Sequence, residues 1–360
     1  MNYNFFKGKK IVVTGHTGFK GSWLVAWLSL LNSRVMGISL DPITSPNHYD
    51  LIKRKIKILD KRINIKNYIK LKNEIEKFKP DIIFHLAAQS LVSKSYLDPR
   101  LTIETNTIGT LNVLESIKEL NKDCNLIVIT SDKCYQNKEL LRSYHEKDEL
   151  GGDDFYSASK ASAEIIVKAF YKSFLLKKKN IRICTARAGN VVGGGDWSEN
   201  RLIPDCVKKW YKNQYVSIRN PSSTRPWQHV MDALSGYLYL AYNLSKNKKL
   251  NGQSFNFSNN KITNLTVKQF LIKFKKNWKK SKWKLLKKSS FHENNLLQLN
   301  SIKAKKLLKW KNTLSLDETI NLTSEWYLNH YKNNKILTID QIKFFLSLNE
   351  SSNISRRIRN

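Results

Sequence analysis

Short apolar segments alternate with longer amphipathic ones through the first half of this 360-residue chain. The apolar segments have the length of buried strands, and glycine, proline or polar residues follow each of them closely. They cover residues 11–14, 35–39, 81–85, 126–130 and 181–187. The helices expected between them cover residues 22–31, 67–78, 99 to about 120, and 156–176. This alternation predicts an α/β fold with a doubly wound parallel sheet.

The alternation ends after Arg187. Three consecutive glycines at 193–195 predict a flexible loop, and the elements beyond it are shorter. We therefore expect a main domain of residues 1–187, to which a strand and a helix return from residues 225–260. Residues 188–348 are expected to form mainly a smaller, substrate-binding lobe. Residues 349–360 are polar and basic and are predicted to be a disordered tail.

The composition is that of a folded protein with many lysines. The 63 Lys and Arg residues against 29 Asp and Glu give a formal charge of +34. No zinc-finger, helix-turn-helix or RNA-recognition pattern accompanies this charge, so we do not expect a nucleic-acid partner. We interpret the charge as a general bias towards lysine, and its positive field favours an anionic small molecule.

The cysteines and the N-terminal segment bear on the compartment. The four cysteines lie far apart and form no CxxC pair, which indicates a reducing compartment and no metal site. The N-terminal segment has no signal-peptide pattern, and no apolar run is long enough to span a bilayer. We therefore expect a cytoplasmic protein without a membrane partner.

A glycine-rich loop, GHTGFKG, joins the first predicted strand to the first predicted helix. Gly15, Gly18 and Gly21 permit a tight turn and a close approach of the backbone to a pyrophosphate at the helix N-terminus. Asp41 stands just past the second strand, where a carboxylate would accept hydrogen bonds from a ribose diol. No arginine follows Asp41 closely in sequence, which favours NAD over NADP; Asp41 also suits the turn before Pro42.

A second group of residues predicts alcohol chemistry. Tyr156 and Lys160 are four residues apart and share one face of a predicted helix. A cationic lysine beside a phenol lowers the pKa of the phenol, so Tyr156 is the expected base. Asp132 and Lys133 follow a strand end, where α/β sheets place ligand chemistry. They indicate a second proton transfer, although a turn aspartate and a surface lysine are the structural alternatives.

With these motifs, the chain resembles the CDP-glucose 4,6-dehydratases, which belong to the extended short-chain dehydrogenase/reductase superfamily. The similarity extends from about residue 8 to the segment LTIDQI that begins at Leu337. The matching segments are GHTGFKGSWL from Gly15, HLAAQ from His85, TSDKCY from Thr130, LGGDDFYSASK from Leu150, ARAGNVVGGGDW from Ala186, RLIPD from Arg201 and TRPWQHV from Thr224.

The resemblance implies a Rossmann-type domain, tightly bound NAD and conversion of CDP-glucose into a 4-keto-6-deoxy sugar, usually by a homodimer. The implied catalytic residues are Ser131, Asp132, Lys133, Tyr156 and Lys160. The implied cofactor-binding residues are Gly15, Thr17, Gly18, Phe19, Lys20, Gly21, Asp41, Asn64, Ile65, Leu86, Ala87, Ala88, Gln89, Tyr156 and Lys160. The implied substrate-binding residues are Ser131, Asn190, Arg201, Leu202, Arg225 and His229; capping of a helix is the alternative for His229.

Four positions depart from the family's pattern. Asn64 stands where the family has an aspartate near the adenine, and its amide oxygen can still accept a hydrogen bond from the adenine amino group. Ser90 and Phe155 replace usual prolines, and His145 replaces a usual arginine. These departures concern cofactor affinity and loop geometry rather than the expected chemistry.

The residues suggest three steps. Tyr156 takes the C4 hydroxyl proton while hydride passes to NAD. Asp132 then protonates the departing C6 hydroxyl as the C5 proton is removed. Finally, hydride returns to C6 and a proton to C5. Lys133 is either the C5 base or a cation that stabilises the enolate. The alternatives are a 4,6-dehydratase for another nucleotide-hexose, a 4-epimerase, which has no use for Asp132 and Lys133, and an NAD-binding regulatory protein.

Overall fold

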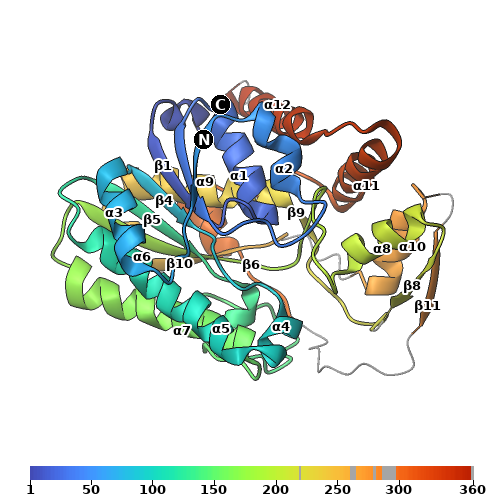
Figure 1. Ribbon diagram of the computed structural model, residues 1–360, viewed down its shortest axis with the longest axis horizontal. Coiled ribbons are helices and arrows are strands. Elements are labelled where there is room, and N and C mark those ends of the chain that lie inside the picture. The colour runs from blue at the N-terminus through green and yellow to red at the C-terminus, as the bar shows by residue number, and fades with distance from the viewer. Residues whose placement is uncertain (219, 260–264, 279–280, 286–296, 358–360) are drawn as a thin grey trace.

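The computed structural model describes residues 1–218, 220–259, 265–278, 281–285 and 297–357 (Figure 1). A seven-stranded sheet with the order β10-β6-β5-β4-β1-β2-β3 lies at its centre. Every strand pairing in this sheet is parallel. Its strands are β1 (Lys10–Thr14), β2 (Arg34–Ser39), β3 (Ile58–Arg62), β4 (Ile82–His85), β5 (Cys124–Ile129), β6 (Ile181–Ala188) and β10 (Gln253–Phe257).

Both faces of the sheet are covered by helices. Successive residues of a strand point to opposite faces, so Ile11 and Val13 belong to one hydrophobic core and Val12 to the other. Five of the seven strands are buried on both faces for most of their length and read as continuous apolar runs, so they were predictable from the sequence. The first core is covered by α1 (Phe19–Leu30), α9 (Val230–Lys246), α11 (Leu316–Asn333) and α12 (Thr338–Arg357), and the second by α3 (Tyr68–Phe78), α6 (Gly109–Lys118) and α7 (Phe155–Phe170).

Two predicted helices contain a π-helical turn. The helix expected from Pro99 consists of α5 (Pro99–Ile103), the π turn η3 (Glu104–Ile108) and α6, while α7 continues into the π turn η5 (Tyr171–Leu175). The remaining short helical segments are η1 (Tyr3–Phe6), α2 (His48–Ile52), η2 (Lys53–Lys55), α4 (Val92–Leu97), η4 (Asp132–Cys134), η6 (Lys248–Leu250) and η7 (Ala304–Leu308).

Helix α1 is buried on all sides. Its sequence is apolar all round rather than amphipathic, and a helix of that kind needs cover on every face. Trp27 packs edge-on against Phe345 of α12, with ring centroids 5.3 Å apart. Trp23 Nε1 donates a 2.9 Å hydrogen bond to the carbonyl of Gly194. The helix that follows the glycine loop is therefore held by segments from the far end of the chain.

A smaller lobe projects from one side of the sheet (Figure 1). Its described part contains α8 (Leu202–Tyr211), β8 (Tyr215–Ile218), α10 (Val267–Lys275) and β11 (Lys282–Leu285), with β8 and β11 paired in parallel. Two further strands, β7 (Val191–Val192) and β9 (Gln228–His229), pair with each other. Helix α9 and strand β10, from the region 225–260, belong to the main sheet and its cover.

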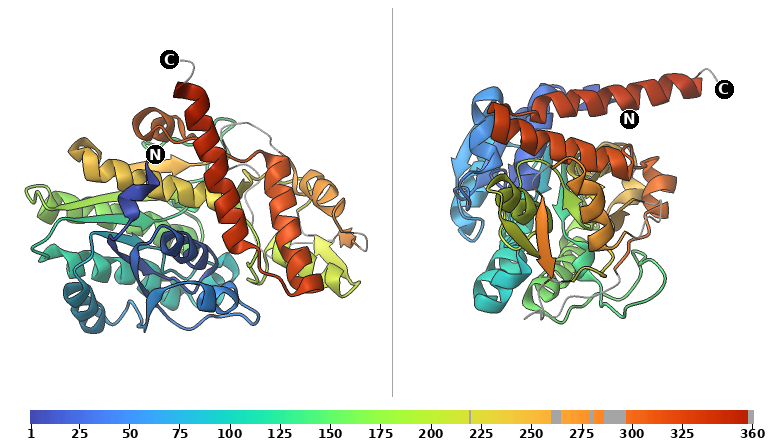
Figure 2. Two further views of the ribbon diagram at one scale, coloured as in Figure 1. Left: turned by 90° about the horizontal axis from the view of Figure 1, so that it is seen from above. Right: turned by 90° about the vertical axis from the view of Figure 1, so that its right-hand side faces the viewer.

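The C-terminal helices pack on the main domain, and α11 also packs on α10 of the smaller lobe, where Lys273 Nζ lies 2.8 Å from Asp317 Oδ1 (Figure 2). His48 Nε2 and Thr338 Oγ1, at the start of α12, share a 2.7 Å hydrogen bond. Helix α12 continues to Arg357, which differs from the disordered tail expected from residue 349, because buried Ile342 and Phe345 anchor its first half and the helix extends from there. Residues 358–360 lie outside the described residues.

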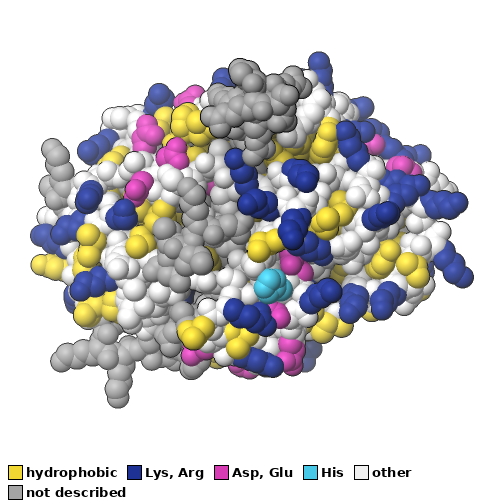
Figure 3. All heavy atoms as spheres, turned by 180° about the vertical axis from the view of Figure 1, so that it is seen from behind, with side chains coloured by type: hydrophobic (Ala, Val, Ile, Leu, Met, Phe, Trp, Pro, Cys, Tyr) yellow, Lys and Arg dark blue, Asp and Glu magenta, His cyan; other side chains and the backbone are white. Residues whose placement is uncertain are grey.

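The described residues contain no helix that is long and apolar enough to cross a membrane. Among the same residues, no three His, Cys, Asp or Glu side chains are grouped so that they would hold a metal ion. On the face drawn in Figure 3, Lys and Arg side chains are scattered, with Asp and Glu between them, and do not gather in one stripe.

Candidate active site

The glycine loop lies between β1 and α1, as the sequence predicts. Gly15 has φ +75°, and a Cβ there would lie 2.7 Å from the backbone nitrogen of Ala87; a Cβ at Gly21 would lie 2.1 Å from the Gly15 carbonyl oxygen. Gly18 caps α1 and would meet only the Gly15 carbonyl oxygen, at 3.4 Å. The first N–H groups of a helix have no partner within it, so the loop fits a dinucleotide diphosphate.

The surroundings of Asp41 correct one sequence argument. Parallel pairing of β2 and β3 places Arg62 opposite Ser39, and Arg62 Nε lies 3.4 Å from Asp41 Oδ1. An arginine is thus near Asp41 in space although none follows it closely in sequence, and the preference for NAD cannot rest on that absence. Asp41 is 87% exposed. Thr17 shares a hydrogen bond with Ser39 and donates another to the carbonyl of Leu40.

The segment after β4 is held in place by its own hydrogen bonds. Leu86 and Ala87 donate from their backbone N–H groups to Thr14, and Ala88 follows them in the same loop. The side-chain amide of Gln89 forms hydrogen bonds with the backbone of Leu91 and with the hydroxyl of Thr102. The side chain of Asn106, in η3, accepts from the backbone N–H of Gln89 and donates to its C=O. Asn106 therefore fixes the backbone of this loop through two hydrogen bonds.

The residues expected near the adenine also take part in local packing. Asn64 Oδ1 accepts the backbone N–H of Lys66 at 2.9 Å, which leaves that oxygen one free lone pair at most for an adenine amino group. Ile65 is buried, and its side chain packs against Gly109 so closely that a Cβ there would lie 2.5 Å from Ile65 Cδ1. The adenine role of both residues remains a prediction. His16 of the glycine loop is buried, and its Nε2 lies 3.0 Å from Asp60 Oδ1.

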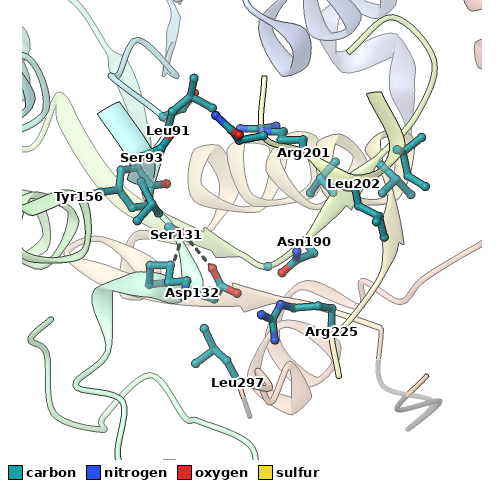
Figure 4. A pocket seen from close by; sticks show the side chains of 18 of the residues that line it. Leu91, Ser93, Ser131, Asp132, Tyr156, Asn190, Arg201, Leu202, Arg225 and Leu297 are labelled. Atoms are coloured by element: carbon teal, nitrogen blue, oxygen red, sulfur yellow. Dashed lines mark hydrogen bonds between the residues drawn. The ribbon is translucent and has the colours of Figure 1, made fainter. Parts of the chain in front are cut away.

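After β5 and Thr130 the chain forms a tight polar turn, which we call the catalytic turn (Ser131, Asp132 and Lys133). Ser131 Oγ accepts the N–H of Lys133 at 3.2 Å and donates to Asp132 Oδ1 at 2.9 Å (Figure 4). Asp132 is 5% exposed, and burial raises the pKa of its carboxyl above the ordinary value, while the Lys133 charge opposes this. A raised pKa keeps a carboxyl protonated, as a general acid requires.

Tyr156 and Lys160 lie on α7, as expected, but their electrostatics differ from the sequence prediction. Burial raises the pKa of Tyr156 to about 12, although the neighbouring Ser131 and Arg201 favour the phenolate. Lys160 Nζ donates instead to the carbonyl of Ile129 at 3.5 Å, and burial, together with the Lys20 charge, lowers its pKa to about 8. The net shift of the Tyr156 pKa is therefore upward, because desolvation outweighs the groups that favour the phenolate, and the effect of Lys160 on it stays a prediction.

These residues open into a cleft of about 630 Å³ between the main domain and the smaller lobe. Tyr156 and the catalytic turn border one side of it, and Asn190, Arg201, Leu202 and Arg225 the other (Figure 4). Phe19 and Lys20 of α1 and the departure Ser90 also line it. The volume is in the range of small-molecule sites. The cleft therefore brings together most of the residues expected to act on the substrate.

Two cations face each other across the substrate side of this cleft. Arg201 precedes α8, and its Nη1 lies 3.1 Å from Asp196 Oδ2. Arg225 Nη1 donates to the carbonyl of Thr224, which holds the guanidinium group against the backbone. Guanidinium groups suit phosphate oxygens because their donors form a planar fork.

His229 is not part of the cleft, which corrects its expected role in substrate binding. Its side chain is fully buried, caps α9 by accepting the Met231 N–H at 3.2 Å, and packs against Trp23 with ring centroids 6.0 Å apart. Trp197 is likewise a core residue, whereas Trp227 is both packed against Phe270 and adjacent to the cleft. The capping position decides the orientation of His229, since its ring must turn towards the helix start.

Sequence reasoning missed a buried ion pair beside the site. Glu164 of α7 and Arg187 of β6 are 2% and 3% exposed, and their charged groups are 2.7 Å apart. The signal was present in the sequence: a glutamate on the apolar face of a predicted helix and an arginine at the end of an apolar strand.

Two of the departures from the family's pattern, His145 and Phe155, are exposed and lie outside the cleft.

The comparisons with known proteins agree with this geometry. The model of a family described as GDP-mannose 4,6 dehydratase matches residues 12–323. The chain belongs to this family. One relative, the CDP-glucose 4,6-dehydratase of Salmonella typhimurium, is 40% identical over 330 residues, which is 90% of this chain and 92% of that protein.

Solved structures show the same fold at lower identity. Epimerase Mth375 of Methanothermobacter thermautotrophicus matches with a TM-score of 0.80 at 21% identity, over 92% of this chain and 95% of that chain. The dTDP-glucose 4,6-dehydratase of Bacillus anthracis, solved with NAD, matches with a TM-score of 0.74 at 20% identity, over 92% and 100%.

The capping role of His229 generates a prediction about pH. Burial lowers the pKa of His229 to about 3, so below about pH 6.5 the unfolded chain binds a proton that the folded chain does not. This residue's contribution to stability is complete above pH 6.5 and is lost as the pH falls. His229→Asn keeps a capping acceptor without a titrating ring. Between pH 6 and 4.5, the free energy of unfolding of His229→Asn should fall less steeply with decreasing pH than that of the wild type. The two slopes should differ by about 1.4 kcal/mol per pH unit.

Urea denaturation across this pH range measures the slope. His145→Asn, at an exposed residue, is the matched control and should keep the slope of the wild type. An unchanged slope in His229→Asn would contradict the assignment of His229 as a buried neutral cap.

Proposed function

We propose that the protein is a CDP-glucose 4,6-dehydratase that uses NAD. The observation that carries this proposal is the meeting of Tyr156 with a buried Asp132 in one cleft, beside Ser131 and Lys133. Oxidation of an alcohol requires the tyrosine alone, whereas removal of water also requires an acid. The Salmonella relative supports both the reaction and the cytidine nucleotide.

The substrate's diphosphate would lie between Arg201 and Arg225, whose opposed positions match two anionic phosphates. Asn190 and Leu202 border the same side. This placement directs the glucose towards Tyr156 and Ser131. Gly15, Gly18 and Gly21 and the start of α1 would hold the cofactor diphosphate, with Thr17, Phe19, Lys20, Asp41, Asn64, Ile65 and residues 86–89 around it. NAD, when bound, accepts a hydride from a sugar carbon and later returns it.

Tyr156 would remove the proton of the C4 hydroxyl during oxidation. Its pKa of about 12 shows that burial alone opposes ionisation, so the phenolate depends on nearby positive charge and on the Ser131 hydroxyl. Lys160, on the same helix, would contribute such charge and contact the nicotinamide ribose. Ser131 would then hydrogen-bond the C4 oxygen, on which negative charge develops in the next step.

Asp132 would act in the elimination step. Once C4 is a ketone, the C5 proton becomes acidic, and the C6 hydroxyl must leave as water. Burial raises the pKa of the Asp132 carboxyl, which favours its protonated form, and this carboxyl would donate its proton to the departing oxygen. Lys133 lies on the same turn and lines the cleft. It would either remove the C5 proton or stabilise the enolate with its charge.

The apolar residues on the outer helices support a homodimer. Leu101 of α5, Ile108 of η3 and Ile165 of α7 are 39%, 45% and 54% exposed, and α5, η3 and α7 pack side by side. A second copy of the chain would bury this face, which we call the α5–α7 face (Leu101, Ile108 and Ile165). The four cysteines are free thiols, and we place the enzyme in the cytoplasm, whose reducing conditions keep thiols in that state.

The reaction is tested by incubating the purified protein with CDP-glucose and NAD in deuterated water and following the sugar by NMR. A 4-keto-6-deoxy product with deuterium at C5 is expected. Turnover of UDP- or dTDP-glucose in place of CDP-glucose would retain the chemistry and overturn the nucleotide. A 4-epimer that keeps its C6 hydroxyl would overturn the dehydratase function.

Two substitutions should separate oxidation from elimination. Asp132→Asn removes the acid but keeps the size of the side chain, so oxidation at C4 proceeds and elimination slows by about 10²-fold or more. Reduced nicotinamide should then accumulate when substrate is added, as its near-ultraviolet absorbance reports. Tyr156→Phe should prevent this absorbance change altogether. Normal turnover by Asp132→Asn would exclude the acid role.

The homodimer is tested by placing a charge on its proposed interface. Ile165→Asp should shift the protein from dimer to monomer in sedimentation equilibrium, because a buried unpaired carboxylate opposes association. Leu285→Asp, on β11 of the smaller lobe and similarly exposed at 57%, is the matched control and should remain dimeric. A monomeric wild type at micromolar concentration would rule out the proposed dimer.

A further inference from the structure

The buried pair of Glu164 and Arg187 lies at the centre of a polar network beneath the active site. Glu164 Oε2 accepts hydrogen bonds from Arg187 Nη2 at 2.7 Å, from Thr185 Oγ1 at 2.8 Å and from Ser254 Oγ at 3.1 Å. Arg187 is held in its charged form by the carboxylate, which raises its pKa well above the ordinary value against the effect of burial. This network joins α7 to β6 and β10.

The same network reaches the chain on both sides of the catalytic turn. Thr130, directly before the turn, donates from Oγ1 to Glu164 Oε1 at 2.5 Å. Tyr135, two residues after the turn, accepts a 2.7 Å hydrogen bond from Arg187 Nη1 and donates to Asn256 Oδ1 at 2.8 Å. The catalytic turn is therefore fixed at its two ends by the two members of one ion pair.

Glu164 and Arg187 themselves are not among the residues that line the cleft. Thr130 and Ser131 are consecutive in an extended segment, so their side chains point to opposite sides, one towards Glu164 and the other towards Asp132. Any effect of the pair on the reaction must thus pass through the backbone of the turn. That makes them positioning residues rather than catalytic ones.

Stability alone does not explain the pair. Two charges removed from water are seldom more stable than well-packed apolar side chains of the same volume. Their geometry is specific, however: Tyr156, Lys160 and Glu164 all lie on α7, whereas Asp132 lies on η4. A rigid connection from Glu164 to Thr130 sets the distance between the helix that carries the base and the turn that carries the acid.

We propose that the Glu164–Arg187 pair positions the catalytic turn for elimination, through Thr130 and Tyr135. The inference deepens the proposed 4,6-dehydratase function and rests on it. Loosening either contact leaves Tyr156 and Lys160 on their helix, so oxidation at C4 is little affected. It lets Asp132 move away from the C6 hydroxyl, and a displacement of about 1 Å is enough to slow a proton transfer by up to about 10²-fold.

Single hydroxyl deletions test the proposal. Thr130→Val and Tyr135→Phe remove a contact to the turn, and each should lower kcat by about tenfold or more while the fraction of reduced nicotinamide in the steady state rises. Thr130→Ser retains the hydroxyl and should restore turnover to within about threefold of wild type. These measurements use the holoenzyme and the nucleotide-glucose that wild type converts.

Thr185→Val and Ser254→Ala are the matched controls. Each removes one hydrogen bond to the same carboxylate of Glu164, but from a neighbouring strand rather than from the turn. They should lower the melting temperature to a similar extent, without a change in the fraction of reduced nicotinamide.

The outcomes distinguish the two levels of inference. If all four deletions lower kcat in proportion to their loss of melting temperature, with an unchanged reduced fraction, the pair is structural only and the positioning role is overturned. If wild type converts no nucleotide-glucose to a 4-keto-6-deoxy sugar, the proposed function fails, and the positioning role fails with it.

Discussion

The parallel direction of the seven central strands determines where chemistry can occur in this protein. Because all the strands run the same way, their carboxyl ends collect at one edge of the sheet. The glycine loop after β1, the segment after β4 and the catalytic turn after β5 all lie at that edge. Residues separated by more than a hundred positions in the chain are thereby brought around a single cleft.

Burial acts on this cleft in two opposing ways. It raises the pKa of Asp132, which favours the protonated carboxyl, and it also raises the pKa of Tyr156, which makes the phenolate harder to form. An acid gains from removal of water, whereas a base that must carry negative charge loses by it. Formation of the phenolate therefore depends on the cations that line the cleft, among them Lys20 and Arg201, as well as on the lysine of its own helix.

Features that depend on local sequence could be predicted, and features that depend on neighbouring strands could not. The apolar strands, the loop Gly15–Gly21 and the position of Tyr156 follow from short-range patterns. Strand β3 was missed because its sequence ILDKR is half polar at the sheet's edge, and with it the approach of Arg62 to Asp41. The role of His229 stayed open between a ligand and a cap, because the two have the same sequence signature until the helix start is known.

The cover of α1 ties the beginning of the chain to its end. The helix that supports the glycine loop buries Trp27 against Phe345, and α12 occupies the side of α1 that the sheet leaves open. During synthesis, a chain that has not yet reached α12 would present this tryptophan-rich face to water. The cover of the helix that follows the glycine loop, although that helix is encoded first, is thus completed only when the last helix is in place.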